Sequence, residues 1–392
     1  MSLSQTVRPP ETAPGRKRWD AIVVGCGVMG ASVSYNLAKR GLRVLAIERH
    51  GVNNQFGSSH GRTRIIRLAY YEDPRYVPLL RRAYESWREV ESKSGKRLLQ
   101  TTGGLMIGKR EGELVRGVLR SVKEHGLAHE LLSASEAERR FQALTLGDGM
   151  VAVYEEEAGI LFAEECVRAF VGLASESGCD FRFSERVDSW RSIPGGVEVE
   201  TSMGRQTASR LVLCAGAWNS LLVGSVLPLT CERQVPLWFS SRGQDIFAPP
   251  KMPLFIMEEE KGVFYYGLPD VGHGVKVART HGGELSDPDA VRRDVTEEDF
   301  DPVRGFISRR LKKLDGTPIA STTCIYSNTP DLNFAVGQHP ADPNVIVLSA
   351  CSGHGFKFAS VLGEVVADLA TDEKPRYDLS FLGLDRFTGH SG

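Results

Sequence analysis

The chain has 392 residues, of which 48 are basic and 49 acidic, and its formal net charge is −1. This near balance argues against a broad electrostatic surface for nucleic acid or for an anionic membrane. Because a single hydrophobic core rarely grows beyond about 250–300 residues, the length predicts two domains that are interleaved along the chain.

The cysteines and the chain ends also exclude several classes of protein. The seven cysteines, an odd number without C-x-x-C spacing, argue against a disulfide scaffold and against a metal site. Residues 1–18 hold prolines and a basic cluster but no apolar signal-peptide core, so we expect a disordered leader. The longest apolar stretch, 211–229, is interrupted by polar residues and glycines, which favours a strand and a helix over a membrane span. These features predict a cytoplasmic protein with reduced thiols and without a membrane or nucleic-acid partner.

The first predicted unit is a β–turn–α–β arrangement. Residues 21–24 (Ala-Ile-Val-Val) form an apolar, β-branched run typical of a buried parallel strand. The turn Gly25-Cys26-Gly27-Val28-Met29-Gly30 follows, and the composition of residues 31–40 favours a helix that ends at Gly41. Residues 43–48 form a second apolar run that ends in Glu48. The order of these elements predicts a dinucleotide-binding unit.

The glycine turn has the spacing that a pyrophosphate group requires. Gly25 permits the tight turn, Gly27 lets the backbone approach the phosphates, and Gly30 allows close packing of helix and strand. The backbone of Val28 and Met29 opens the helix, whose N-terminus favours an anion. Glu48 can accept hydrogen bonds from ribose hydroxyls and repels a 2′-phosphate. This motif alone does not separate FAD from NAD.

The remaining chain predicts a second unit inserted into the first. Residues 230–275 alternate apolar and polar side chains and contain aromatics, as an antiparallel sheet does. The acidic stretch 282–303 is expected at the surface. Helices are expected over 74–93, 112–126, 164–177 and 355–369, and strands over 104–107, 197–201, 210–215 and 345–348.

Three further motifs carry a specific resemblance. They are Gly57-Ser-Ser-His-Gly-Arg-Thr-Arg-Ile-Ile-Arg67, Thr323-Cys-Ile-Tyr-Ser-Asn-Thr-Pro-Asp331 and Ser352-Gly-His-Gly-Phe-Lys-Phe358. With the N-terminal turn they resemble the monomeric sarcosine oxidase family, which includes pipecolate oxidase and N-methyltryptophan oxidase. The resemblance runs from about Trp19 to about Phe381.

The resemblance implies an α/β fold with a Rossmann-like FAD-binding domain. A second α+β domain with an antiparallel sheet covers the flavin. We expect the FAD domain to comprise residues 19–95, 150–225 and 322–385, and the substrate domain to comprise residues 96–149 and 226–321.

The resemblance also implies how FAD is held. Cys324 matches the cysteine that is joined to the flavin 8α-methyl group, and nearby Arg64 and His60 are expected to favour its thiolate. The family positions that contact the cofactor further match Ser59, Thr63, Val187, Gly353, His354, Gly355 and Lys357. From the residues alone, Cys324 can equally be an inert buried thiol.

Arg67 and Lys357 match the pair that binds the substrate carboxylate in the family. Two cations in a dry pocket would fix a carboxylate and orient the carbon next to it. The alternatives are a surface cation beside Glu72 or Asp73 for Arg67, and a solvent-facing residue at a helix start for Lys357.

Lys276 matches the lysine that activates oxygen in the family, because a fixed positive charge stabilises the charge that develops on oxygen. Its position between two valines also fits a solvent-facing strand residue. Tyr266 and Met257 match positions in the substrate pocket.

Three positions depart from the family pattern. Arg279 and Thr280 replace a Tyr-His pair whose histidine contacts the amine in relatives, and His281 follows them. Cys351 replaces an aromatic residue, which predicts a wider pocket.

The predicted function is an FAD-dependent oxidase of a secondary amine or cyclic imino acid with an α-carboxylate. It would act as a monomer on a small amine and molecular oxygen, and would yield an imine and hydrogen peroxide without a carboxylate base. The alternatives are a flavin amine dehydrogenase with another electron acceptor, a NAD-dependent dehydrogenase and a non-catalytic flavin-bound sensor.

Overall fold

The computed structural model describes residues 18–387. The predicted leader therefore lies outside the described residues except for Arg18, whose guanidinium donates to the carbonyl of Ala208 at 2.9 Å. Among the described residues, no helix is long and apolar enough to cross a membrane.

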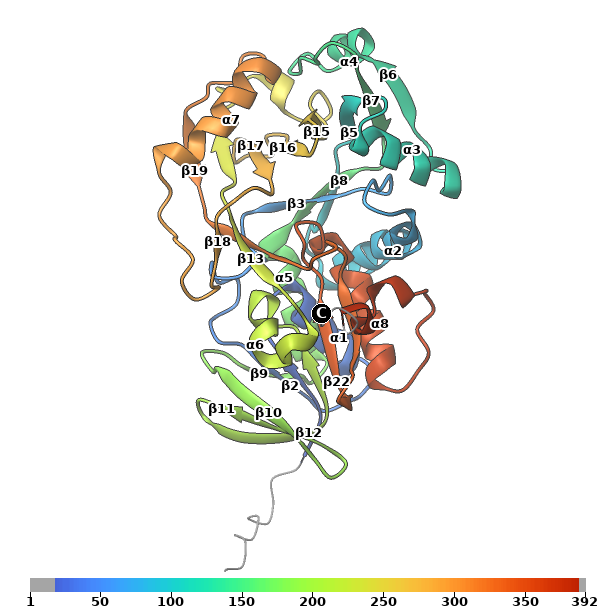
Figure 1. Ribbon diagram of the computed structural model, residues 1–392, viewed down its shortest axis with the longest axis vertical. Coiled ribbons are helices and arrows are strands. Elements are labelled where there is room, and N and C mark those ends of the chain that lie inside the picture. Colours follow the sequence, from blue (N-terminus) through green and yellow to red (C-terminus); the bar gives the residue numbers. More distant parts are fainter. Residues whose placement is uncertain (1–17, 388–392) are drawn as a thin grey trace, which may run out of the picture.

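The first layer is a sheet with a parallel centre, at the lower end of the molecule in Figure 1. Strand β1 pairs in parallel with β2 and β12, and β9 and β22 extend the parallel part on either side. Strands β10, β11 and β21 add antiparallel pairs. The bounds are β1 (Trp19–Val24), β2 (Val44–Ile47), β9 (Asp180–Arg182), β10 (Val187–Ile193), β11 (Gly196–Thr201), β12 (Gly204–Leu213), β21 (Ala335–His339) and β22 (Asp342–Ser349).

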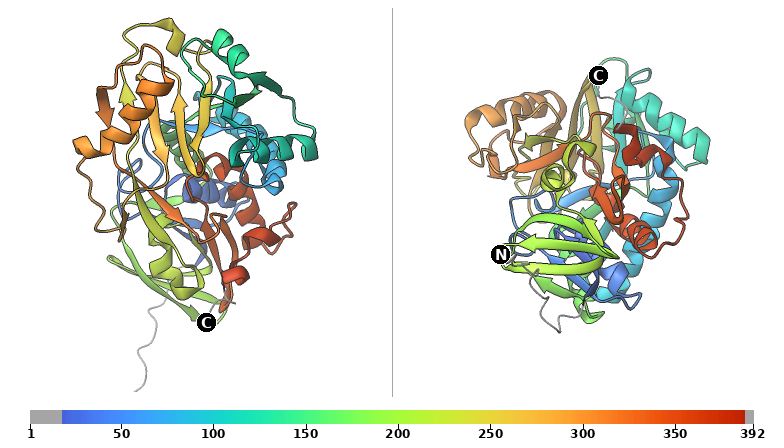
Figure 2. Two further views of the ribbon diagram at one scale, coloured as in Figure 1. Left: turned by 45° about the horizontal axis from the view of Figure 1, so that its top comes forward. Right: turned by 60° about the horizontal axis from the view of Figure 1, so that its bottom comes forward.

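Helices cover one face of this sheet, and α1 packs between α5 and α8. Side chains of β1, β2, β11 and β12 on the other face form a second core, and the right-hand view of Figure 2 brings β10, β11 and β12 to the front in green. The helices on the first face are α1 (Val28–Ala38), α2 (Val77–Ser94), α5 (Ala163–Glu176) and α8 (Ala359–Ala370), whereas α6 (Asn219–Val223) packs on the other face. Alternate side chains of β1 enter two separate cores, which is why the whole strand is apolar.

The second layer is a mostly antiparallel sheet at the upper end of Figure 1, in the order β19-β14-β17-β16-β15-β5-β7-β6. Its bounds are β5 (Gly104–Lys109), β6 (Glu130–Ser133), β7 (Met150–Glu155), β14 (Leu237–Phe239), β15 (Leu254–Glu260), β16 (Val263–Leu268), β17 (Val275–Thr280) and β19 (Pro318–Ser321). Strand β7 belongs to this sheet, although the sequence analysis placed residues from 150 onward in the FAD domain.

The stretch 282–303 lies largely at the surface, as expected, and helix α7 (Glu297–Arg310) begins within it. A capping box at Thr296 starts the helix, and Val303, Phe306 and Ile307 pack into the core of the second sheet. Because the first turn of α7 is acidic, the apolar face of the helix was not recognised from the sequence. The remaining helices beside this sheet are α3 (Glu113–His125) and α4 (Ala134–Arg140).

Two three-stranded sheets connect the layers. One contains β3 (Thr63–Ile66), β4 (Leu99–Thr101) and β8 (Gly159–Phe162), and the other contains β13 (Thr230–Gln234), β18 (Leu285–Ser286) and β20 (Cys324–Asn328). The family motifs around residues 57–67 and 323–331 therefore lie in the connecting sheets. The fold class is the α/β arrangement with a second, antiparallel sheet that the sequence predicted.

Candidate active site

A cavity of about 700 Å³ is lined by residues of the parallel sheet, the second sheet and both connecting sheets. It brings together most of the site residues predicted from the sequence. Those that line it are Gly25, Gly27, Val28, Met29, Glu48, Ser59, Thr63, Arg64, Arg67, Val187, Tyr266, Lys276, Cys324, Gly353, His354, Gly355 and Lys357, whereas Gly30, His60 and Met257 do not.

The glycine turn leaves no room for side chains. A Cβ atom on Gly25, whose φ is +89°, would lie 2.6 Å from the carbonyl oxygen of Cys214. A Cβ atom on Gly30 would lie only 1.7 Å from the carbonyl oxygen of Gly25. Gly30 therefore fixes the packing of α1 against the turn without lining the cavity, as the spacing predicted.

Glu48 is held at the edge of this turn with its carboxylate facing the cavity. Its two carboxylate oxygens accept hydrogen bonds from the backbone N–H groups of Cys26 at 2.8 Å and His50 at 2.9 Å. Because a carboxylate has about four acceptor sites, it can still accept from ribose hydroxyls. The glycine turn and Glu48 thus fit a dinucleotide such as FAD.

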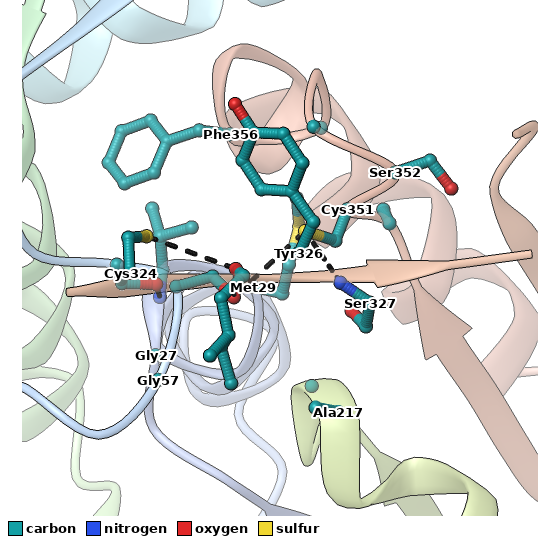
Figure 3. A pocket seen from close by; sticks show the side chains of 18 of the residues that line it. Gly27, Met29, Gly57, Ala217, Cys324, Tyr326, Ser327, Cys351, Ser352 and Phe356 are labelled. Atoms are coloured by element: carbon teal, nitrogen blue, oxygen red, sulfur yellow. Dashed lines mark hydrogen bonds between the residues drawn. The ribbon is translucent and has the colours of Figure 1, made fainter. Parts of the chain in front are cut away.

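Cys324 lies at the start of β20 and lines the cavity. Figure 3 shows it with Tyr326, Cys351 and Phe356, which also line the cavity. Burial raises the pKa of the Cys324 thiol, and Arg64, with Nη2 3.8 Å from Sγ, opposes this rise. The expected positive neighbour is present, but it does not outweigh burial.

His60 does not supply the positive charge expected from the sequence. Burial, together with the nearby Arg64, lowers the pKa of His60 to about 4, so its imidazole is neutral near pH 7. The His60 side chain lies outside the cavity lining, while its carbonyl accepts a hydrogen bond from Arg64. The expectation for the charge of His60 was wrong because burial in a cationic environment disfavours an imidazolium.

Lys276 of β17 faces the cavity and not solvent, since only 2% of the residue is exposed. Its Nζ donates to the carbonyl oxygens of Gly61 at 2.9 Å and Thr63 at 3.0 Å and lies 5.2 Å from the centre of the Trp238 ring. Burial, followed by the charge of Arg64, lowers the pKa of Lys276 well below its usual value. No described carboxylate forms an ion pair with Lys276.

Arg67 is 1% exposed and already has an anionic partner. Both Glu72 carboxylate oxygens accept from its Nη2 at 2.8 Å, and the Ala69 carbonyl accepts from Nη1 at 2.7 Å. Burial alone would raise the pKa of Glu72, but Arg67 and Lys357 outweigh it and keep the carboxyl ionised. The alternative of a surface cation is therefore wrong for Arg67, although the pairing with Glu72 is real.

Lys357 is also buried, which excludes the solvent-facing alternative. Its Nζ donates to the carbonyl of His354 at 2.6 Å, and burial, together with Arg67, lowers its pKa to about 7. The His354 ring contacts Tyr70 Oη through Nδ1 and the Leu332 carbonyl through Nε2. Tyr70 packs under both cations, with Arg67 Cζ 4.4 Å and Lys357 Nζ 5.2 Å from the ring centre.

Met257 is not a pocket residue. It packs into the core on the far face of β15, and its neighbour Ile256 lines the cavity. Side chains alternate between the two faces of a strand, so an error of one residue exchanges pocket and core. On the adjacent β16, Phe264 and Tyr266 line the cavity, and burial raises the pKa of Tyr266 to about 12.

The residues at the three departures from the family pattern, and His281 beside them, differ in whether they line the cavity. Arg279 does not line the cavity and lies opposite Tyr265 in the register of β16 and β17. Thr280, His281 and Cys351 all line the cavity. The ring of His281 is bound by Glu232, which the sequence analysis missed because the two residues are far apart in the chain.

Comparison with known proteins places the chain in a family. Residues 20–369 match the FAD dependent oxidoreductase family. The chain belongs to this family. It is 42% identical over 358 residues to a monomeric sarcosine oxidase of Streptomyces avermitilis, covering 90% of this chain and 93% of the relative. It is 34% identical over 371 residues to an N-methyl-L-tryptophan oxidase of Yersinia pestis, covering 94% and 99%.

A solved structure shares the fold. NikD, described as an unusual amino acid oxidase essential for nikkomycin biosynthesis, superposes with a TM-score of 0.82 and 25% identity, covering 94% of this chain and 98% of that chain. The chain is therefore an FAD-dependent oxidoreductase, and the glycine turn and Glu48 are the residues that fit its cofactor. The NAD-dependent alternative is excluded by the family match.

Proposed function

We propose that this enzyme oxidises the C–N bond of a secondary amine or cyclic imino acid that carries an α-carboxylate. Oxygen is the electron acceptor, and the products are an imine and hydrogen peroxide. The observation that carries the proposal is the pair of buried cations Arg67 and Lys357 in the same cavity as the glycine turn and Lys276. A protein that only stored flavin would need none of these charges.

The charge balance of the cation pair supports a substrate with one carboxylate. When Lys357 is protonated, it and Arg67 carry two positive charges, and the ionised Glu72 supplies one negative charge. One substrate carboxylate would neutralise the remainder, and buried charges are stable only when they are paired. The names of the relatives, which specify sarcosine and N-methyl-L-tryptophan, agree with N-methyl amino acids as the substrate class.

FAD supplies the two-electron redox chemistry when it is bound. Arg67 and Lys357 hold the substrate carboxylate, so that the carbon next to nitrogen has one orientation in the cavity. Tyr266, Phe264 and Ile256 line the cavity with largely apolar side chains, which would exclude water from the bound substrate. Lys276 already donates to the carbonyl oxygens of Gly61 and Thr63, and its ammonium has one further N–H that can point to where negative charge develops during oxygen reduction.

We also propose that FAD is covalently joined to Cys324. Sγ would replace one hydrogen of the flavin 8α-methyl group, with loss of the thiol proton, and the two released electrons would pass to oxygen. The buried position of Cys324 in the cavity supports the attachment. In wild-type protein, acid precipitation should leave yellow flavin in the pellet, and Cys324→Ala should release it. Cys351→Ala is the matched control in the same cavity.

The amine-oxidase proposal is tested by a panel of N-methyl amino acids and cyclic imino acids. Oxygen uptake and peroxide release should appear with at least one of them and should require the carboxylate. Bleaching of the flavin without peroxide would favour an amine dehydrogenase, and a flavin that no amine bleaches would favour a sensor.

We further propose that the enzyme is a monomer, as is the relative named monomeric sarcosine oxidase. Light scattering of the holoenzyme tests this proposal.

A further inference from the structure

His281 lies in a strained turn on the wall of the cavity. Strand β17 ends at Thr280, and His281 follows with φ +61°, a left-handed conformation that residues other than glycine rarely adopt. The turn presents the His281 ring to the cavity, next to Tyr326, at 5.3 Å between ring centres in an edge-to-face arrangement. Strained backbone of this kind persists where the surrounding structure holds it and is concentrated at functional sites.

Glu232 of β13 holds the His281 ring in one orientation. The Glu232 carboxylate accepts from His281 Nδ1 at 3.1 Å, from Gly283 N–H at 2.8 Å, from Gln234 Nε2 at 2.8 Å and from Asn328 Nδ2 at 2.6 Å. Burial opposes ionisation, but these hydrogen bonds outweigh it and lower the pKa of Glu232. Because the carboxylate only accepts, Nδ1 carries the hydrogen, and in the neutral ring Nε2 is therefore the acceptor.

The free Nε2 atom lies beside the turn that also carries the carboxylate-binding lysine. A Cβ atom on Gly353 would lie 3.3 Å from His281 Nε2. The next residue, His354, provides the carbonyl that accepts from Lys357 Nζ. An α-amine is one carbon away from the carboxylate, so a substrate held by Lys357 presents its nitrogen near this turn.

We propose that His281, oriented by Glu232, accepts a proton from the substrate ammonium group before oxidation. This inference rests on the proposed function. One N–H bond of the ammonium breaks and its electron pair stays on nitrogen, while the lone pair of Nε2 forms the new N–H bond. The resulting imidazolium is held by the Glu232 carboxylate. The step is needed because α-amino groups titrate near pH 8 or above, and only a neutral amine can form C=N.

The ionisable groups around His281 are the Glu232 carboxylate, the nearby Arg279 cation and two neutral side chains. Burial raises the pKa of Tyr326 and lowers that of His354 to about 4, so both of these side chains are neutral. Arg279 of β17 lies near the turn, since its Nη2 would be 2.8 Å from a Cβ atom on Gly282. The His281 side chain is 30% exposed, which gives water a route to remove the proton.

The test is anaerobic stopped-flow reduction of the holoenzyme flavin by its amine substrate across pH. In His281→Asn, the second-order rate constant should fall about 10²-fold at pH 7, and the deficit should vanish as pH approaches the pKa of the amine itself. Added imidazole should restore part of the rate, and Glu232→Gln should cause a smaller loss. His273→Asn, an exposed histidine outside the cavity lining, is the matched control.

An equal loss at every pH without rescue by imidazole, or no loss, would overturn the role of His281. If no amine reduces the wild-type flavin, the proposed function fails instead, so the two failures are distinguishable.

A second measurement keeps the inference testable if the variants do not fold. In wild-type holoenzyme with ¹⁵N-labelled histidine, 2-aminoisobutyrate, which has no oxidisable C–H beside nitrogen, should convert one neutral imidazole to imidazolium. Pivalate has the same shape and carboxylate but no amine, and should not do so. The same histidine protonation with both ligands would overturn the proposal.

Discussion

Lys276 and Lys357 are two buried lysines in different walls of one cavity, and their neighbours separate their tasks. Lys276 is held by two carbonyl oxygens and an indole ring, without a described carboxylate in contact. Lys357 is electrostatically coupled to the Arg67–Glu72 ion pair, which leaves one net positive charge. This contrast indicates that a lysine without a carboxylate in direct contact can stabilise charge that develops transiently, whereas a cation cluster with a fixed anion can bind a permanent carboxylate.

The largest expected effect comes from removing the isolated lysine. Lys276→Met should slow the reaction of reduced enzyme with oxygen by about 10²–10³-fold, because a preorganised donor is lost. Reduction by substrate should change far less. Stopped-flow measurement of the two half-reactions separates these effects, and equal slowing of both would remove the proposed role of Lys276.

Removal of the other lysine, Lys357, should impair substrate binding and leave the oxygen reaction nearly unchanged. Lys357→Met should weaken binding of the substrate carboxylate by about 10–10²-fold, the range expected for a lost charged hydrogen bond. The oxygen reaction should stay within a few-fold of wild type. If Lys357→Met impaired only the oxygen reaction, the assignments of the two lysines would have to be exchanged.

A third prediction concerns the alkaline side of the pH profile. Lys357 has a pKa of about 7, below its usual value, and only its protonated form binds a carboxylate. The value of kcat/KM for carboxylate substrates should therefore decline as pH rises above about 7, and Lys357→Met should lack this decline. A wild-type profile that stays flat to high pH would contradict the assignment.

The smallest expected effect tests the fixed anion. Glu72 raises the pKa of Lys357, so Glu72→Gln should move the alkaline decline of kcat/KM to lower pH. The rate of oxygen reaction should not change, because Glu72 has no contact with Lys276. Glu156→Gln, an exposed residue, provides the control. A shift toward higher pH would show that Glu72 acts in another way.

The sequence predicted the cofactor turn well because its residues are contiguous. Strand, glycines, helix and Glu48 lie within thirty residues, and Gly25 and Gly30 answer local steric demands that the structure shows. Lys276 was also placed correctly, although its two valine neighbours allowed a solvent-facing position as well.

Long-range contacts were harder to predict. The fully buried segment Phe255-Ile-Met257 has no polar residue to mark its faces, so the choice of Met257 over Ile256 was an error of one residue. Glu232 and His281 meet only because a left-handed turn after β17 returns the chain to β13. The Arg67–Glu72 pair is close in sequence, but its burial depends on the surrounding fold.

The most direct test of the whole account is a two-step experiment on the purified holoenzyme. N-methyl amino acids and cyclic imino acids, each with a decarboxylated analogue as control, are mixed with the protein without oxygen, and oxygen is then admitted. We expect a carboxylate-bearing amine to bleach the flavin, its decarboxylated analogue to leave the flavin coloured, and oxygen to restore the colour with release of peroxide. Bleaching by the decarboxylated amine to the same extent, or no bleaching by any amine, would contradict the proposed function.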